Sequence, residues 1–205
     1  MKIDLIAGAR PNFIKIAAII DAIEKAQNEG RNIGYRLIHT GQHYDKNMSG
    51  SFFDELHIPE PDFNLGAGGG TQAEQTSSIM LGYEKILLSE KCDLCLVVGD
   101  VTSTMACAIV AQKMHIKVAH VEGGLRSFDW TMPEEINRLV TDSITNYFFT
   151  TTEIANEHLR REGISDNRLF LVGNTMIDTL FKFRSGFVRP KIWNVVGLEE
   201  KKYIV

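Results

Sequence analysis

Two acidic residues directly follow apolar runs of the kind that form buried strands. Asp100 follows Leu94–Val98 after one glycine, and Glu122 immediately follows Lys117–Val121. Carboxylates at strand ends can serve as general base and general acid toward a bound ligand. Asp100 could equally cap a helix or form a turn, whereas glutamate is a weak turn former. The structural explanation is therefore weaker for Glu122 than for Asp100.

Two basic residues could hold an anion near these carboxylates. Arg10 lies in Gly8-Ala9-Arg10-Pro11, at the expected start of the first helix, and Lys15 follows about one turn later. Free amides at a helix start and a nearby guanidinium favour anion binding. The segment is neither a Walker motif nor a Gly-x-Gly-x-x-Gly motif, so a glycine turn with two solvated cations explains it as well.

A third charged group lies in Pro133-Glu134-Glu135-Ile136-Asn137-Arg138, which is expected to open a helix. Proline suits the first helical turn, and acidic residues behind it complement the helix dipole. Glu134 and Arg138 are four residues apart and share one helix face. Taken alone, the segment predicts a surface ion pair between them.

Two other motifs are more typical of structure than of chemistry. Gly66-Ala67-Gly68-Gly69-Gly70-Thr71 lacks the lysine of a P-loop and predicts a flexible connection, with Thr71 and Glu74 forming a capping box. Cys92-Asp93-Leu94-Cys95 enters an apolar strand, and neither a second Cys-x-x-Cys nor paired histidines complete a zinc site. We therefore expect buried structural thiols, and a satisfied core histidine at His120.

The elements that must position these residues alternate between apolar runs and amphipathic segments. The runs predict strands at Lys2–Ile6, Tyr35–His39, Leu94–Val98, Lys117–Val121, Tyr147–Phe149 and Leu169–Val172. The segments predict helices at Phe13–Gln27, Ala73–Ser89, Thr104–Met114, Glu134–Ser143 and Glu153–Glu162. Most runs lack polar alternation, as do strands buried on both faces. The pattern predicts an α/β fold with a doubly wound, Rossmann-like parallel sheet.

Ligands bind such folds at the carboxyl ends of strands, where the strand order reverses. Five loops that follow the runs contain charged residues, amides or glycines, at residues 7–11, 40–43, 99–102, 122–126 and 173–175. One of Thr102, Ser103 and Thr104 is expected to cap the helix that follows Asp100.

Composition narrows the class of protein. The 205 residues carry a formal net charge of −4, and 44% are hydrophobic, which is the balance of a globular protein. An acidic total argues against nucleic acid as the main partner. No apolar stretch reaches the roughly 18 residues that a membrane span needs, and the N-terminus lacks a secretory pattern. Three cysteines make a poor disulfide framework, so a cytoplasmic location is expected.

Taken together, six segments in this order closely resemble the non-hydrolysing UDP-N-acetylglucosamine 2-epimerases. They are Gly8-Ala9-Arg10-Pro11 with Lys15, Thr40-Gly41-Gln42-His43-Tyr44, Val98-Gly99-Asp100, His120-Val121-Glu122-Gly123-Gly124-Leu125-Arg126-Ser127, Pro133-Glu134-Glu135-Ile136-Asn137-Arg138 and Gly173-Asn174-Thr175-Met176-Ile177-Asp178. The resemblance covers about residues 2–205. It implies the first half of a two-domain GT-B fold.

The resemblance also implies an activity, which is the interconversion of UDP-GlcNAc and UDP-ManNAc. UDP is eliminated to give a 2-acetamidoglucal and is then added back, without a metal, nicotinamide or flavin. The family's catalytic carboxylates correspond to Asp100, Glu122 and Glu134. Its substrate-binding residues correspond to Arg10, Lys15, Gln42, His43 and Arg138. The base at C2 is not assigned among the three carboxylates.

The division into domains follows from the same resemblance. Residues 1–190 are expected to form the N-terminal Rossmann-like domain. Residues 191–205 are expected to be a linker and the first strand of a missing C-terminal domain, which in the family carries a catalytic histidine and most uridine contacts. From pattern alone, Tyr203-Ile204-Val205 could equally be an edge strand or a disordered tail. A homodimer is expected, and the isolated chain is expected to be inactive.

One position departs from the family. Some bacterial members are activated by a second substrate molecule, which is held partly by an arginine–glutamine pair after the glycine-rich segment. Here that pair reads Glu74-Gln75, so we expect weak or absent activation of this kind. Two other classes compete with the epimerase. A GT-B glycosyltransferase would not need the carboxylate triplet, and a binding or assembly module would fit a chain that encloses a nucleotide-sugar only partly.

Overall fold

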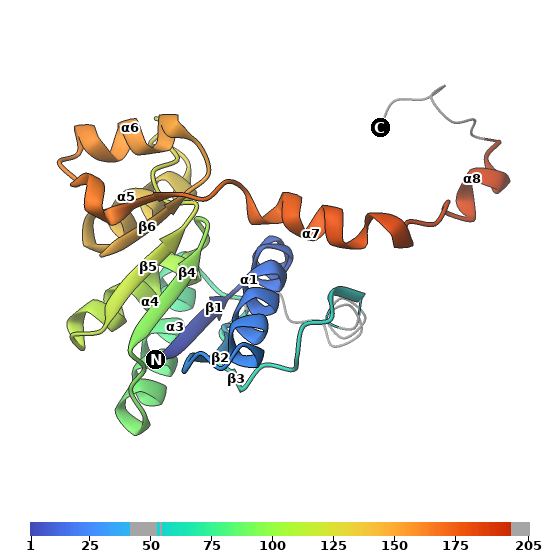
Figure 1. Cartoon of the computed structure of the whole chain (residues 1–205). Helices are drawn as coiled ribbons and strands as arrows, with labels where there is room; N and C mark the ends of the chain where they lie inside the picture. The colour runs from blue at the N-terminus through green and yellow to red at the C-terminus, as the bar shows by residue number, and fades with distance from the viewer. Residues whose placement is uncertain (42–52, 54, 198–205) are drawn as a thin grey trace.

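The computed structural model describes residues 1–41, 53 and 55–197. Its centre is a parallel sheet of seven strands in the order β3-β2-β1-β4-β5-β6-β7 (Figure 1). The strands are β1 (Lys2–Ala7), β2 (Gly34–His39), β3 (Phe63–Asn64), β4 (Leu94–Val98), β5 (Lys117–Val121), β6 (Tyr147–Thr150) and β7 (Leu169–Leu171). The predicted doubly wound α/β fold is confirmed.

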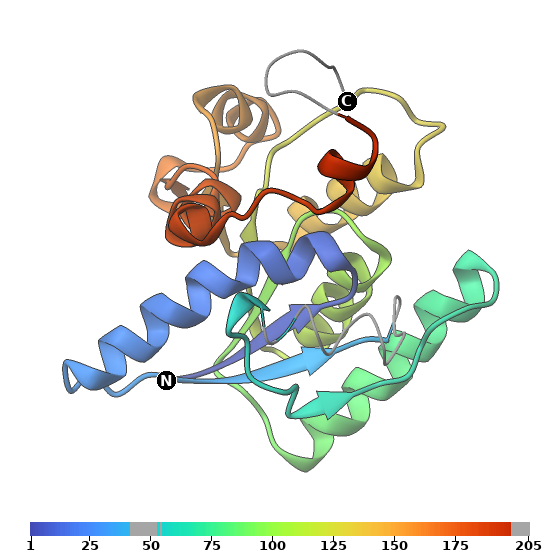
Figure 2. The same ribbon diagram turned by 90° about the vertical axis from the view of Figure 1, so that its right-hand side faces the viewer.

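Helices cover both faces of the sheet (Figures 1 and 2). They are α1 (Arg10–Asn28), α3 (Gln72–Ser89), α4 (Thr102–Lys113), α5 (Pro133–Ile144), α6 (Glu153–Arg161), α7 (Thr175–Phe183) and α8 (Ile192–Val195), with 3-10 turns η1 (Asp166–Arg168) and η2 (Arg184–Gly186). On one face α4 packs between α3 and α5, and on the other α1 packs with α7. Within the described residues, no helix has the length and hydropathy that crossing a membrane requires.

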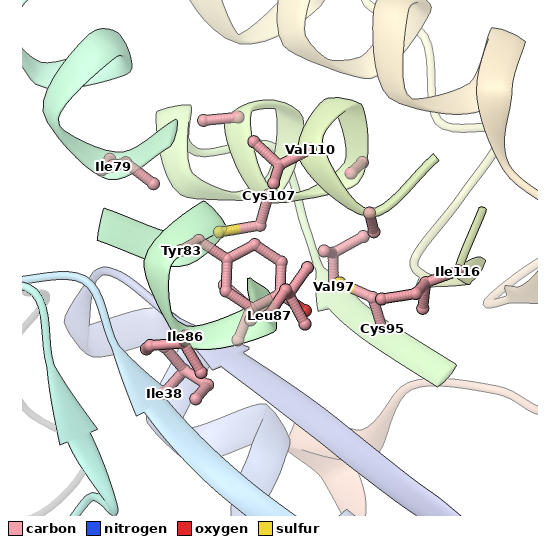
Figure 3. Packing of buried hydrophobic residues seen from close by; sticks show 14 of the residues in the cluster. Ile38, Ile79, Tyr83, Ile86, Leu87, Cys95, Val97, Cys107, Val110 and Ile116 are labelled. Carbon is pink, nitrogen blue, oxygen red and sulfur yellow. The ribbon is translucent and has the colours of Figure 1, made fainter. Parts of the chain in front are cut away.

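The buried side chains explain why the strands read as continuous apolar runs. Figure 3 shows one core cluster, in which Tyr83 and Leu87 of α3 pack with Cys107 of α4 and Val97 of β4. The three cysteines are free and buried, as predicted. Burial and the nearby Asp4 carboxylate raise the pKa of the Cys92 thiol to about 12, which keeps it protonated and unreactive.

Three of the four features predicted for helix N-termini are observed. Pro11 and Pro133 lie in the first turns of α1 and α5. Thr71 and Glu74 form the predicted capping box, since Thr71 N donates to Glu74 Oε2 at 2.8 Å and Glu74 N donates to Thr71 Oγ1 at 3.2 Å. The prediction for α4 is wrong, because its N-cap is Val101. Thr104 Oγ1 donates instead to the Val98 carbonyl, at 2.9 Å.

Three elements were not predicted: β3, α7 and α8. The N-terminus of α7 is capped by Asn174, whose Oδ1 accepts from Met176 N at 2.9 Å. Thr179 Oγ1 then donates to the Ile14 carbonyl at 2.7 Å and fixes α7 against α1. Beyond α7 the chain runs away from the sheet toward α8 (Figure 1). The predicted strand at 203–205 lies outside the described residues, so the proposed domain boundary stays a prediction.

Candidate active site

The site lies where the strand order reverses. After β1 the chain adds β2 and β3 on one side, and it then returns to add β4 on the other side of β1. In doubly wound folds the loops on the two sides of such a reversal diverge, and ligands bind in the crevice at these carboxyl ends. The carboxyl ends of β1 and β4 point to one edge of the sheet, together with that of β5 (Figure 1).

Asn12 holds the two sides of this crevice together. Its Oδ1 accepts from the backbone N–H groups of Gly8 and Ala9 at 3.2 and 3.0 Å, and its Nδ2 donates to the Val98 carbonyl at 2.9 Å. A single buried amide thus satisfies three polar groups in loops that neighbour each other only in the fold. Sequence reasoning missed Asn12. The available signal was a polar residue on the apolar face of an amphipathic helix.

Lys15 and Glu122 form an ion pair between α1 and the loop after β5. Both side chains are mostly buried, at 12% and 10% exposure. The poor solvation expected for Glu122 is therefore observed. A Cβ atom on Gly99 would lie 3.4 Å from Lys15 Nζ and 3.7 Å from Glu122 Oε2, so the Gly99 backbone borders the pair directly.

Glu122 adopts a left-handed backbone conformation, with φ of +70°. For a residue other than glycine this conformation costs about 1–2 kcal/mol. Such strain is concentrated at functional sites, where the surrounding structure enforces it. Here the flanking hydrogen bond from Glu122 N to the Phe149 carbonyl, at 2.9 Å, continues the pairing of β5 with β6 and fixes the residue.

Asp100, the residue after Gly99, forms a second ion pair with Arg138. Arg138 directs Nη2 and Nε at Asp100 Oδ2, at 2.5 and 3.1 Å. Its Nη1 contacts Glu135 Oε2 at 2.6 Å. The predicted pair between Glu134 and Arg138 is wrong. Tertiary structure places the Asp100 carboxylate beside the guanidinium, and the helix supplies its second carboxylate from three residues away instead of four.

Glu135 is a buried anchor for the loop between β5 and α5. Its carboxylate accepts from the N–H groups of Ser127 and Phe128 and from Ser127 Oγ, each at 3.0 Å. Burial alone would raise its pKa, but these hydrogen bonds and the Arg138 guanidinium outweigh that effect and lower the pKa of Glu135 to about 2. Glu135 lies in the first turn of α5, as predicted for an acid that complements the helix dipole, and it also holds the preceding loop.

Glu134 and Arg10 stand apart from this network. Glu134 is half-buried and Arg10 is exposed at the start of α1. Among the described residues, neither side chain makes a hydrogen bond or an ion pair. Both are therefore available to a ligand. Gln42 and His43 lie outside the described residues, so the structure does not test their predicted place in the site.

The predicted core histidine is confirmed, with unexpected partners. His120 is completely buried in β5, and its ring nitrogens lie 2.7 Å from Asp142 Oδ1 and from the Gly99 carbonyl oxygen. The second oxygen of Asp142 accepts from Gly124 N at 3.0 Å and from Arg126 Nη1 at 2.7 Å. This polar network contacts the turn that carries Asp100 through the Gly99 carbonyl.

The arrangement supplies proton-handling and anion-binding groups within one crevice. Two carboxylates each face a cation: Glu122 faces Lys15 beside Gly99, and Asp100, the residue after Gly99, faces Arg138. Carboxylates can take up and return a proton, while lysine and arginine can hold a departing anion. Within the described part of the chain, no three His, Cys, Asp or Glu side chains are grouped as a metal site.

Comparison with known proteins bears on these groups. A family model described as UDP-N-acetylglucosamine 2-epimerase matches residues 25–205. UDP-N-acetylglucosamine 2-epimerase of Methanocaldococcus jannaschii is 52% identical over 178 residues, which are 87% of this chain and 47% of that protein. UDP-2,3-diacetamido-2,3-dideoxy-D-glucuronate 2-epimerase of Pseudomonas aeruginosa is 41% identical, over 93% of this chain and 53% of that protein.

Solved structures give the same result. The M. jannaschii UDP-GlcNAc 2-epimerase in complex with UDP-GlcNAc and UDP matches with a TM-score of 0.87 and 47% identity, over 96% of this chain and 53% of that one. The chain thus spans about half the length of the relatives that it matches. Because the family model covers most of its residues, the chain belongs to the UDP-N-acetylglucosamine 2-epimerase family.

Proposed function

We propose that this chain forms the N-terminal domain of a two-domain GT-B enzyme that interconverts UDP-GlcNAc and UDP-ManNAc. The observation that carries the proposal is the two carboxylate–cation contacts, Lys15–Glu122 beside Gly99 and Asp100–Arg138 at the next residue, at the point where the strand order reverses. Residues 1–190 would be the domain itself. The following residues would lead into a C-terminal domain that completes the nucleotide site.

The chemistry of the reaction calls for these groups. Inversion at C2 requires loss of an unactivated C–H proton. Anti elimination makes this possible, because the C2–H electrons form the C1–C2 double bond while UDP leaves from C1. The proton then returns to the other face of C2, and UDP adds back at C1. A carboxylate base, a proton donor and cations for the departing diphosphate are all needed.

The residues divide between these tasks. Asp100 and Glu122, whose carboxylates border the Gly99 turn, exchange the C2 proton. Glu134, which has no protein partner among the described residues, positions the sugar. Arg10, Lys15 and Arg138 meet the diphosphate, with Gln42 and His43 as further substrate-binding residues. A GT-B glycosyltransferase would use the same fold but would have no use for the carboxylate triplet.

Hydrogen exchange at C2 tests the assignment. The two-domain enzyme is incubated with UDP-GlcNAc in D2O, and deuterium at C2 is followed by NMR. We expect Asp100→Asn and Glu122→Gln each to slow exchange by about 10²–10⁴-fold, the usual contribution of a general acid or base. The matched control is Glu84→Gln, because Glu84 is an exposed acid on α3 that makes no hydrogen bond or ion pair with the described residues. Normal exchange in both Asp100→Asn and Glu122→Gln would overturn the proposal.

The purified 205-residue chain provides a second test. We expect weak UDP-GlcNAc binding and no turnover, because a single domain encloses only part of a nucleotide-sugar. Turnover near the rate of a complete epimerase would contradict this expectation. Substrate choice is tested in the complete enzyme by comparing UDP-GlcNAc with the UDP-2,3-diacetamido-2,3-dideoxy-D-glucuronate named in the P. aeruginosa relative.

We also propose a cytoplasmic homodimer. Leu81 and Leu88, one heptad apart on α3, are 60% and 71% exposed and offer an apolar surface for a second copy. Light scattering of wild-type chain and of the Leu81→Lys, Leu88→Lys double variant would test this. A monomeric wild type would refute it.

A further inference from the structure

His120 is enclosed by hydrogen-bond acceptors. Its side chain is 1% exposed, and its two ring nitrogens lie 2.7 Å from two oxygens on opposite sides of the ring. One oxygen belongs to the Asp142 carboxylate and the other is the Gly99 carbonyl. A carbonyl oxygen can only accept a hydrogen bond. The ring nitrogen that faces Gly99 must therefore carry a proton.

The nitrogen that faces Asp142 is subject to the same requirement if that carboxyl group is ionised. The Arg126 guanidinium, whose Nη1 lies 2.7 Å from Asp142 Oδ2, favours the ionised carboxylate whatever the state of the ring. This second carboxylate oxygen already accepts two hydrogen bonds, from Gly124 N and Arg126 Nη1. Asp142 is thus an acceptor on both oxygens, and it has no proton to offer the ring.

We propose that His120 is a buried imidazolium and that it acts as a positioning residue for the turn that carries Asp100. A neutral imidazole has one N–H and one lone pair. Either neutral tautomer would point a lone pair at an oxygen 2.7 Å away. Only the doubly protonated ring donates to both neighbours, and 2.7 Å is the expected length of a charge-assisted hydrogen bond.

Charge balance within the network supports this protonation state. Asp142 and Arg126 are 1% and 2% exposed, and the Arg126 guanidinium also pairs with Glu162 at 2.7 Å. With His120 as a cation, two negative groups face two positive groups. With a neutral ring, the Arg126 guanidinium would be shared between the buried Asp142 carboxylate and Glu162, whose side chain is 39% exposed. A second cation beside Asp142 gives its buried carboxylate a partner of its own.

The Gly99 carbonyl transmits the effect to the site. Because a peptide unit is planar, holding this oxygen also fixes the orientation of the Asp100 N–H and the position of the Asp100 Cα. Gly99 N donates to the Val121 carbonyl at 3.0 Å, so the turn is held from both of its ends. Gly99 also borders Lys15 and Glu122. The imidazolium therefore sets how the two ion pairs lie relative to each other.

The functional consequence rests on the proposed function, whereas the protonation state does not. If Asp100 exchanges the C2 proton, its placement relative to Glu122 decides whether the two carboxylates can reach opposite faces of the sugar. The Asp142→Asn variant separates the charge of the His120 ring from its role in holding the Gly99 carbonyl. The Asn amide would donate to the ring, which would then be neutral, and its oxygen would still accept from Gly124 and Arg126. The ring would keep its Nε2–H bond to Gly99.

The test uses the 205-residue chain with ¹⁵N-labelled histidine, at neutral pH and without substrate. Loss of signals in His120→Gln assigns the ring, and the exposed His115→Asn is the control for unrelated changes. We expect two one-bond N–H couplings from the wild-type His120 ring, and one, at Nε2, in Asp142→Asn. A single coupling in the wild type, or two in Asp142→Asn, would overturn the proposal.

The backbone amide of Asp100 reports the positioning role. We expect its signal to stay within the range of the His115→Asn control in Asp142→Asn, and to shift clearly beyond that range in His120→Gln, while amides of α3 stay unchanged. A shift in Asp142→Asn as large as in His120→Gln would refute positioning through the Gly99 carbonyl. If His120→Gln does not fold, the ring is assigned as the one whose couplings change from two to one in Asp142→Asn, and no such change would overturn the proposal. A shift of the Asp100 amide in Asp142→Asn beyond the range of the His115→Asn control would then refute the positioning role. Because no substrate is present, these results are independent of the outcome of C2 exchange.

Discussion

Replacing Glu135 by glutamine tests the origin of the stability of the loop that borders the site. The carboxylate accepts three hydrogen bonds from Ser127 and Phe128 and contacts Arg138. A glutamine has nearly the same shape, but its NH2 group is a donor. It would face the N–H or O–H donors of Ser127 or Phe128, which now donate to the carboxylate. Glu135→Gln therefore removes the charge and leaves at least one buried donor unpaired.

The pKa of Glu135 gives the magnitude. Its value falls from 4.5 to about 2 in the folded state. At about 1.36 kcal/mol per unit, ionisation in the folded protein contributes at most about 3 kcal/mol at neutral pH. Arg138 keeps Asp100 as a second partner in the variant, which recovers part of this energy. We expect Glu135→Gln to lower the free energy of unfolding by about 2 kcal/mol at pH 7.

The pH dependence has a definite sign. Because folding lowers the pKa, the contribution is fully present above the ordinary value of 4.5 and is lost as the pH falls toward 2. Urea unfolding of wild type and Glu135→Gln at pH 7, 5, 4 and 3 measures this contribution as the difference between their free energies of unfolding. Less than half of the difference seen at pH 7 should remain at pH 3. A difference of the same size at pH 7 and pH 3 would refute the electrostatic explanation.

Glu134→Gln is the matched control for that experiment. It changes the neighbouring glutamate in the same helical turn, and Glu134 makes no hydrogen bond or ion pair among the described residues. We expect its unfolding free energy to stay within about 0.5 kcal/mol of wild type at every pH.

Three further predictions use the same structure. Asn12→Ala leaves the Gly8 and Ala9 N–H groups and the Val98 carbonyl unpaired. It should lower the free energy of urea unfolding by about 3 kcal/mol with an unchanged m-value. A loss below about 0.5 kcal/mol would refute the stabilising role of Asn12. Gly124→Ala should prevent stable folding, because the new Cβ would lie 2.5 Å from the Ala155 carbonyl oxygen and the backbone φ is +83°. Gly163→Ala has a similar φ of +86° but open space around it, so it should lower the free energy of unfolding by only about 1 kcal/mol. Equal melting temperatures for these two variants would contradict the steric argument. The complete enzyme should show weak or absent substrate activation through the 74–75 pair, because an acid replaces the cation there and Glu74 is held in the Thr71 capping box. Sigmoidal kinetics that are lost in Gln75→Ala would contradict this.

The elements that follow local rules were predictable from the sequence. Leu94–Val98 and Lys117–Val121 are strands with the predicted bounds, because strands covered on both faces have few polar positions. Two residues at β3 are too few to form a pattern. The α7 helix does have a sequence signal, since Asn174 precedes apolar residues at helical spacing, although the loop pattern of Gly173-Asn174-Thr175 alone does not predict it.

The contacts of the site were less predictable than its location. Strand ends indicated Asp100 and Glu122, because parallel strands bring their carboxyl ends to one edge. Helical spacing suggested Glu134 as the partner of Arg138, but the observed partners are Asp100, 38 residues away, and Glu135. Spacing along one helix describes only neighbours on that helix. The lateral placement of α5 against the turn after β4 depends on packing that no local pattern encodes.

The net charge of −4 gives no hint of this site, because its three cations and three carboxylates cancel in the sum. Four of the six are paired with each other, as Lys15–Glu122 and Asp100–Arg138. That pairing has a consequence for the proposed reaction. A diphosphate that enters the crevice competes with Glu122 for Lys15 and with Asp100 for Arg138. Each cation that turns to the diphosphate releases a carboxylate, which can then take the C2 proton. Substrate binding and base activation would thus be one event. In Lys15→Met, Glu122 would have no counterion to lose when substrate binds, so binding of the substrate would no longer be coupled to release of this carboxylate. We expect the variant to bind UDP-GlcNAc more weakly.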